Sequence, residues 1–186
     1  MDRPTCVIDA LARTPSERDL DDLAALLGDA VDSGAAVSFL APLPRDAARA
    51  FWRRTAAEMG ARSVVLVARD GLGIAGTVTL HAAWAPNQPH RGEIAKLIVH
   101  RRARRQGLGD RLMERAEQHA RDVGLSLLTL DAKRGAAAEL LYQRRGWTRV
   151  GAIPDFAVDP DGAALHDTVI YFKRVGAGPE LPLHRT

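Results

Sequence analysis

The residues best suited to bind a ligand form one turn, Arg104-Arg105-Gln106-Gly107-Leu108-Gly109. This turn follows an apolar stretch and precedes a helical pattern, so it is predicted to lead from a strand into a helix. Glycines at such a point expose backbone N–H groups, and the helix dipole adds positive potential. Further arginines at 101 and 102 add positive charge. We therefore predict that a pyrophosphate binds at this turn.

The turn differs from the two common nucleotide-binding motifs. No Lys-Ser/Thr pair follows Gly109, as a Walker A loop requires, and the three-glycine fingerprint of dinucleotide-binding folds is absent. A surface turn with solvated arginines is the alternative, because short motifs match by chance.

Two carboxylates are candidates for moving protons. Glu93 begins the apolar strand predicted at 92–99, and apolar surroundings are expected to raise its pKa. Asp131 ends the next parallel strand, where open α/β sheets place their ligands. The alternatives are that Glu93 is a solvated charge and that Asp131 caps a loop or pairs with Lys133.

Periodicity predicts the elements that position these residues. The strand at 92–99, the helix at 107–122 and the strand at 125–132 form a βαβ unit, so the two strands are expected to be parallel with a right-handed crossover. On this helix, Glu117 and Arg121 are expected to form an exposed pair. The other predicted elements are a strand at 6–9, helices at 15–32, 45–59 and 136–145, a hairpin of 63–70 and 74–84, and an antiparallel pair of 147–153 and 167–175 joined by a loop at 154–166.

Length and composition are typical of one globular domain. The chain has 186 residues, 46% hydrophobic and 26% charged, and we expect one domain at 1–175 with a loose tail at 176–186. Cys6 is the only cysteine, and neither a signal peptide nor a membrane-spanning run is recognised, so a cytoplasmic protein without membrane association is expected. The six histidines lack metal-ligand spacing, so no metal site is predicted. A net charge of +3 and 5% aromatic residues argue against nucleic-acid binding.

Two motifs in order carry a family resemblance. The turn matches Arg/Gln-x-x-Gly-x-Gly/Ala, and Ala138, Leu141, Tyr142, Gly146 and Trp147 match a second spacing after the next strand. In both, the chain resembles the GCN5-related N-acetyltransferases (the GNAT superfamily), and longer segments are similar to its tabtoxin resistance members. The resemblance implies an α/β fold with a mixed, mostly antiparallel sheet, a central parallel βαβ unit, splayed strands and helices on both faces.

The resemblance also implies a ligand and roles for residues. Acetyl-CoA would be the co-substrate, with its pantetheine arm along Leu97, Ile98 and Val99 and its pyrophosphate on the amides of Arg104, Arg105, Gln106, Gly107, Leu108 and Gly109. Glu93 and Asp131 would be the candidate bases, and Tyr142 would protonate the departing thiolate; the alternative for Tyr142 is a core aromatic. Many relatives carry Asn seven residues before this tyrosine, whereas this chain has Gly135.

The expected reaction is transfer of an acetyl group to a primary amine of a small molecule, a metabolite or an amino-bearing antibiotic or toxin. A protein or peptide amine is the second interpretation; an open acidic groove would favour it, and a closed pocket would favour a small molecule. A nucleic-acid-binding module based on 100–105 and a catalytically idle acetyl-CoA sensor are further alternatives. A homodimer is expected from the frequency of dimers with this fold.

Overall fold

The computed structural model describes residues 6–178, in which seven strands form one sheet in the order β1-β2-β3-β4-β5-β7-β6. All neighbouring strands are antiparallel except β4 and β5, which are parallel. This confirms the predicted α/β fold with its mixed sheet and central βαβ unit. The strands are β1 (Val7–Ala10), β2 (Val64–Asp70), β3 (Gly73–Ala82), β4 (Arg91–Val99), β5 (Leu127–Lys133), β6 (Thr148–Val158) and β7 (Leu165–Arg174).

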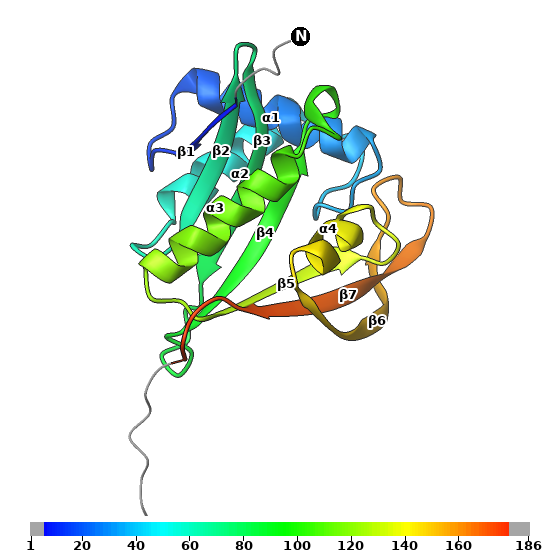
Figure 1. Cartoon of the computed structure of the whole chain (residues 1–186). Helices are drawn as coiled ribbons and strands as arrows, with labels where there is room; N and C mark the ends of the chain where they lie inside the picture. The colour runs from blue at the N-terminus through cyan, green and yellow to red at the C-terminus, as the bar shows by residue number, and fades with distance from the viewer. Residues whose placement is uncertain (1–5, 179–186) are drawn as a thin grey trace, which may run out of the picture.

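Helices cover both faces of the sheet (Figure 1). On one face, α1 (Glu17–Asp32) and α2 (Arg45–Ala57) bury Leu23, Leu27 and Trp52 against β2 and β3. On the other face, α3 (Leu108–Asp122) and the short α4 (Ala138–Arg144) pack over the second core. A single turn of 3-10 helix, η1 (Arg101–Ala103), links β4 to the glycine turn. The two apolar cores hold the central strands between the helix layers.

The predicted loop at 154–166 is wrong for most of its length. β6 continues to Val158 and β7 begins at Leu165, with an irregularity in their pairing between Ile153 and Ala157. Pro154 and Asp155 lie in this irregularity, and Asp155 has a positive φ of 51°. Prolines are tolerated in edge strands and bulges, so a composition typical of a loop here belongs to an interrupted edge strand.

The predicted exposed pair of Glu117 and Arg121 is also wrong. Glu117 is 3% exposed and accepts hydrogen bonds from Arg145, Trp147 Nε1 and Lys173 Nζ, the last two at 3.0 and 2.9 Å. Arg121 donates to Gln118 instead. The buried carboxylate therefore ties α3 to β7 and to the residues that follow α4.

Within the described residues, the structure shows neither a membrane-spanning helix nor a cluster of metal ligands. Between residues 6 and 178, no helix has the length and hydropathy needed to cross a membrane. The same range contains no group of three or more His, Cys, Asp or Glu side chains arranged to hold a metal ion. Most of the tail predicted at 176–186 lies outside the described residues, and the domain division stays a prediction.

Candidate active site

The site begins where β4 and β5 separate. Their parallel pairing covers three positions, the last joining Glu93 to Thr129, after which the strands diverge. On its other side, β4 contains a bulge at Lys96, whose φ is 51°, opposite the register shift in β3. Beyond Glu93, the backbone groups of β4 that face β5 have no strand partner among residues 6–178. Those groups include part of the backbone predicted to contact a ligand at 97–99, where Ile98 and Val99 also pair with β3.

The glycine turn offers a second set of free backbone groups. Arg105 and Gly107 both have left-handed φ angles, 60° and 77°, and α3 begins directly after them. The amide N–H groups of residues 105–110 donate to no acceptor in the described chain. Alternating backbone conformations of this kind gather N–H groups into a concave nest, and the N-terminus of α3 adds its dipole. The turn therefore fits a pyrophosphate through its main chain.

A single groove joins these two sets of groups. It has a volume of about 830 Å³ and continues into a smaller pocket of about 350 Å³ beside the loop after α1. Ser38, Asp131 and Lys133 line both spaces. The predicted site residues that line the groove are Leu97, Ile98, Val99, Arg104, Arg105, Gly107, Leu108, Gly109, Asp131 and Tyr142.

Two predicted site residues lie outside the groove wall. Glu93 is solvent-exposed and pairs across the sheet with His81, so the apolar surroundings expected for it are not found. The Gln106 side chain donates to the carbonyl oxygen of Arg102 at 3.1 Å, and Gln106 does not line the groove.

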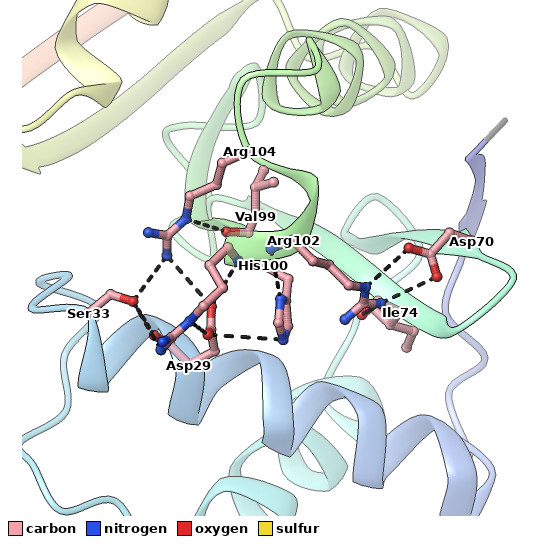
Figure 2. A network of polar contacts seen from close by, with 9 residues as sticks. Asp29, Ser33, Asp70, Ile74, Val99, His100, Arg102 and Arg104 are labelled. Atoms are coloured by element: carbon pink, nitrogen blue, oxygen red, sulfur yellow. Dashed lines mark hydrogen bonds and ion pairs between the residues drawn. The ribbon is translucent and has the colours of Figure 1, made fainter. Parts of the chain in front are cut away.

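The arginines beside the turn are mostly engaged by acids of the protein (Figure 2). Asp29, near the end of α1, forms an ion pair with the side chain of Arg101, and its Oδ2 lies 3.6 Å from Nη2 of Arg104. Arg102 forms an ion pair with Asp70 at 3.2 Å. The expectation of four arginines around the ligand is therefore corrected, because Arg101 and Arg102 do not line the groove. Arg104 and Arg105 remain on its wall.

Asp29 anchors the start of the turn. Its carboxylate is 8% exposed and accepts a hydrogen bond of 3.0 Å from the Arg101 backbone amide. Burial by itself raises the pKa of this carboxyl, but the hydrogen bonds from Arg101 and the nearby charge of His100 hold the pKa below its ordinary value. The ionised carboxylate therefore fixes η1 against α1.

Asp131 lies on the wall of both the groove and the smaller pocket. Its side chain accepts a hydrogen bond of 3.0 Å from Thr168 Oγ1 of β7. The alternative pairing with Lys133 does not occur, because the ammonium of Lys133 contacts Asp159. Asp131 is thus oriented by β7 while it keeps an exposed face toward the groove.

Tyr142 reaches the groove from α4 and is 5% exposed. Its ring packs near those of Trp147 and Tyr171, with centroid distances of 6.1 and 5.7 Å. Burial, followed by the charge of Asp131, raises its pKa well above the ordinary value. The hydroxyl therefore stays protonated near neutral pH, and it forms no hydrogen bond within residues 6–178.

Gly135 also lines the groove, in a left-handed conformation with a φ of 81°. Its amide donates to Glu139 Oε1. A Cβ at this position would meet no atom within 4 Å. The space that a longer side chain would fill in this wall is thus left to a ligand.

The sequence analysis missed Asp29, which anchors the turn, and among the groove-lining residues it missed Ser38 and Lys96. Asp29 occupies a buried position on the apolar side of α1, and a polar residue in such a stripe is the one signal the sequence offers. Ser38 and Lys96 carry no sequence signal, because their positive φ angles, 72° and 51°, arise from the loop and the bulge.

Replacing Asp29 by Asn is expected to reduce the free energy of unfolding by about 1–3 kcal/mol at pH 7, since Arg101 and Arg104 lose their shared carboxylate partner. Because the folded-state pKa of Asp29 lies below its unfolded value, its stabilisation is present above the unfolded pKa and is lost as pH falls through the folded one. Denaturant unfolding at several pH values should therefore show a wild-type advantage that shrinks below about pH 4. Asp122→Asn, at an exposed position of α3, is the control. If the stability difference between the wild type and Asp29→Asn stays the same at acid pH, the proposed role of the ionised Asp29 carboxylate is contradicted.

Comparisons with known proteins agree with this geometry. Residues 28–147 match the model of the acetyltransferase (GNAT) family. An N-acetyltransferase from Staphylococcus aureus Mu50 superposes with a TM-score of 0.77 at 20% identity, covering 92% of this chain and 99% of that one. A Salmonella typhimurium protein assigned as an acetyltransferase, solved with its cofactor acetyl-CoA, gives 0.77 at 18%, covering 96% and 99%. The ribosomal-protein-alanine N-acetyltransferase from Brucella melitensis gives 0.74 at 20%, covering 90% and 99%.

At these identities the structural similarities establish the fold. The family model spans more than half of the chain and includes the βαβ unit, the glycine turn and Tyr142. The finer resemblance to tabtoxin resistance acetyltransferases stays a prediction. The chain belongs to the acetyltransferase (GNAT) family and is an N-acetyltransferase with acetyl-CoA as its co-substrate.

Proposed function

We propose that this enzyme transfers the acetyl group of acetyl-CoA to a primary amine of a small molecule, a metabolite or an amino-bearing antibiotic or toxin. The observation that carries this proposal is the smaller pocket, which the loop after α1 and the strands β6 and β7 surround. Phe39 and Phe156 contribute apolar walls, and Asp131 is the one acidic residue lining it within the described chain. An amine-bearing molecule fits such a mixed pocket.

The cofactor end of the groove is proposed to act mainly by positioning. The amides of 105–110 bind the pyrophosphate, and the backbone groups of 97–99 that do not pair with β3 bind the pantetheine arm. Glycine suits position 107 of the nest, since residues with a Cβ rarely adopt its left-handed φ of 77°. Holding the thioester beside the amine supplies much of the rate enhancement, because the reaction becomes effectively unimolecular.

Two side chains and one backbone amide are proposed to manage charge. Asp131 accepts the proton that the ammonium must lose before its nitrogen attacks the thioester carbonyl carbon. A backbone N–H near Leu97 or Ile98 stabilises the negative charge on the carbonyl oxygen. As the new C–N bond forms and the C–S bond breaks, Tyr142 donates its proton to the departing sulfur. The nitrogen loses its second proton to solvent, and Tyr142 recovers a proton from solvent.

A protein or peptide amine is the second candidate acceptor. It is supported by the structural similarity to the ribosomal-protein-alanine N-acetyltransferase. The groove wall carries only Asp110 and Asp131 as acidic residues between positions 6 and 178, so it lacks the acidic lining expected for a cationic peptide. This observation favours the small-molecule acceptor. A homodimer stays a prediction.

The proposal is tested with a panel of small amines and short peptides, detecting free CoA thiol. Acetyl-CoA alone should raise the melting temperature, since ligand at 100 times its Kd stabilises the folded state by about 2.7 kcal/mol. Thiol release is then expected with small amines more than with peptides. Absence of a thermal shift at millimolar acetyl-CoA, or preference for peptides, contradicts the proposal.

Tyr142→Phe is expected to reduce kcat about 100-fold while changing acetyl-CoA affinity little, because the hydroxyl acts only as the thiol leaves. Steady-state kinetics and calorimetric titration with CoA separate the two effects. Tyr171→Phe, whose hydroxyl bonds Glu139 away from the groove wall, serves as the control for ring packing. Equal losses in turnover and affinity would remove the acid role.

Asp131→Asn and Glu93→Gln distinguish the two candidate bases. Since Asp131 lines the groove and Glu93 does not, Asp131→Asn should lower kcat/KM by about 100-fold, and Glu93→Gln should lower it by less than about threefold. Steady-state kinetics of the two variants and the wild type, with the same amine and saturating acetyl-CoA, check this. A larger effect of Glu93→Gln would assign the proton transfer to Glu93.

A further inference from the structure

Lys96 is held in a fixed position on the wall of the groove. It lies at the bulge of β4, where its own backbone has a left-handed φ of 51°. Its ammonium donates to Ser38 Oγ at 3.0 Å and lies 5.8 Å from the centroid of the Phe51 ring. Ser38 also has a left-handed backbone, with a φ of 72°. Strained backbone positions of this kind persist where the surrounding structure enforces them, often at functional sites.

The charge of Lys96 lacks an anionic partner. No carboxylate of the described chain lies within 4.0 Å of its ammonium, whereas Lys133, the other lysine on the groove wall, pairs with Asp159. Burial lowers the pKa of Lys96 below its ordinary value, and the charges of Asp131 and Glu93 offset this only in part. Shielded cations are normally paired, so this one is suited to an anion that a ligand brings.

The position of Lys96 determines where a ligand anion would lie relative to the reacting amine. Lys96 lies on β4 and Asp131 on β5, on opposite sides of the gap between the diverging strands. Ser38, which contacts Lys96, lines both the groove and the smaller pocket, as Asp131 does. An acceptor with its amine at Asp131 can thus place a second group near Lys96.

We propose that the acceptor is an amino carboxylate, a zwitterion whose carboxylate is bound by Lys96 and by the hydroxyl of Ser38. This inference rests on the proposed small-molecule function and narrows its substrate class. The hydroxyl of Ser38 accepts from Lys96 and keeps its own hydrogen for the carboxylate. Asp131 attracts the amine, and Lys96 discriminates against amines that lack the negative charge.

The test compares amino acids with their carboxamides, which keep size and amine but lose the anion. The wild type should favour the carboxylate member of each pair, and Lys96→Met should lower kcat/KM for it by about 10- to 100-fold, since hydrogen bonds to charged groups contribute this much. For the carboxamide, the change should stay below about threefold. Lys96→Arg should retain most of the preference. Arg53→Met, which removes one charge from α2 away from the groove, should leave it unchanged.

Binding of the N-acetylated products gives a readout that needs no turnover. In the presence of CoA, calorimetry should show tighter binding of the N-acetyl amino acid than of its carboxamide by the wild type, and equal binding by Lys96→Met. If no amine is acetylated, the proposed function fails, yet this binding difference still supports the carboxylate site. Equal binding of both products by the wild type, or an equal loss for both acceptors in Lys96→Met, overturns the inference.

Discussion

The parallel pairing of β4 and β5 ends at Glu93 and Thr129, and beyond this point the side of β4 that faces β5 has no strand partner, while its other side stays paired with β3. Unpaired main-chain groups inside a protein need other partners, so a gap in a sheet is stable only where a ligand or solvent enters it. Everything else in the site is arranged around this gap. The glycine turn lies at one side, Tyr142 covers it from α4, and Asp131 lies on the strand across from it.

Charge around the gap is mostly balanced by the protein itself. Asp29 and Asp70 engage the arginines of η1, so the turn is held to α1 and β2 before any ligand binds. A cradle made of oriented amides needs little further rearrangement to receive an anion, which lowers the cost of binding. Lys96, which has no carboxylate within 4.0 Å among residues 6–178, also lies on the groove wall, where the acceptor is proposed to bind.

Local signals made the secondary-structure elements and the glycine turn predictable, and the family resemblance implied how the elements are arranged. The strands, the helices and the order of the two motifs follow from periodicity and from glycine positions within short windows, and these predictions are confirmed. Features that depend on distant partners were predicted wrongly or missed. Glu117 resembles a surface residue until Arg145 and Lys173 are brought to it, and Asp29 gains its role only beside residues more than 70 positions later. The extent of β6 was hidden because Pro154 interrupts it.

The interruption of β6 at Pro154 affects whether two copies of the chain can pair through this edge of the sheet. β6 is the last strand of the sheet, and its outer edge would otherwise offer eleven residues of continuous backbone to a neighbour. Pro154 supplies no N–H, and the bulge at Asp155 turns the strand out of a straight line. A second register shift, between Arg149 and Gly151, interrupts the stretch before Ile153. No long run of β6 therefore keeps the regular spacing needed to extend the sheet from one copy to the next, so the edge is guarded against fibrillar stacking.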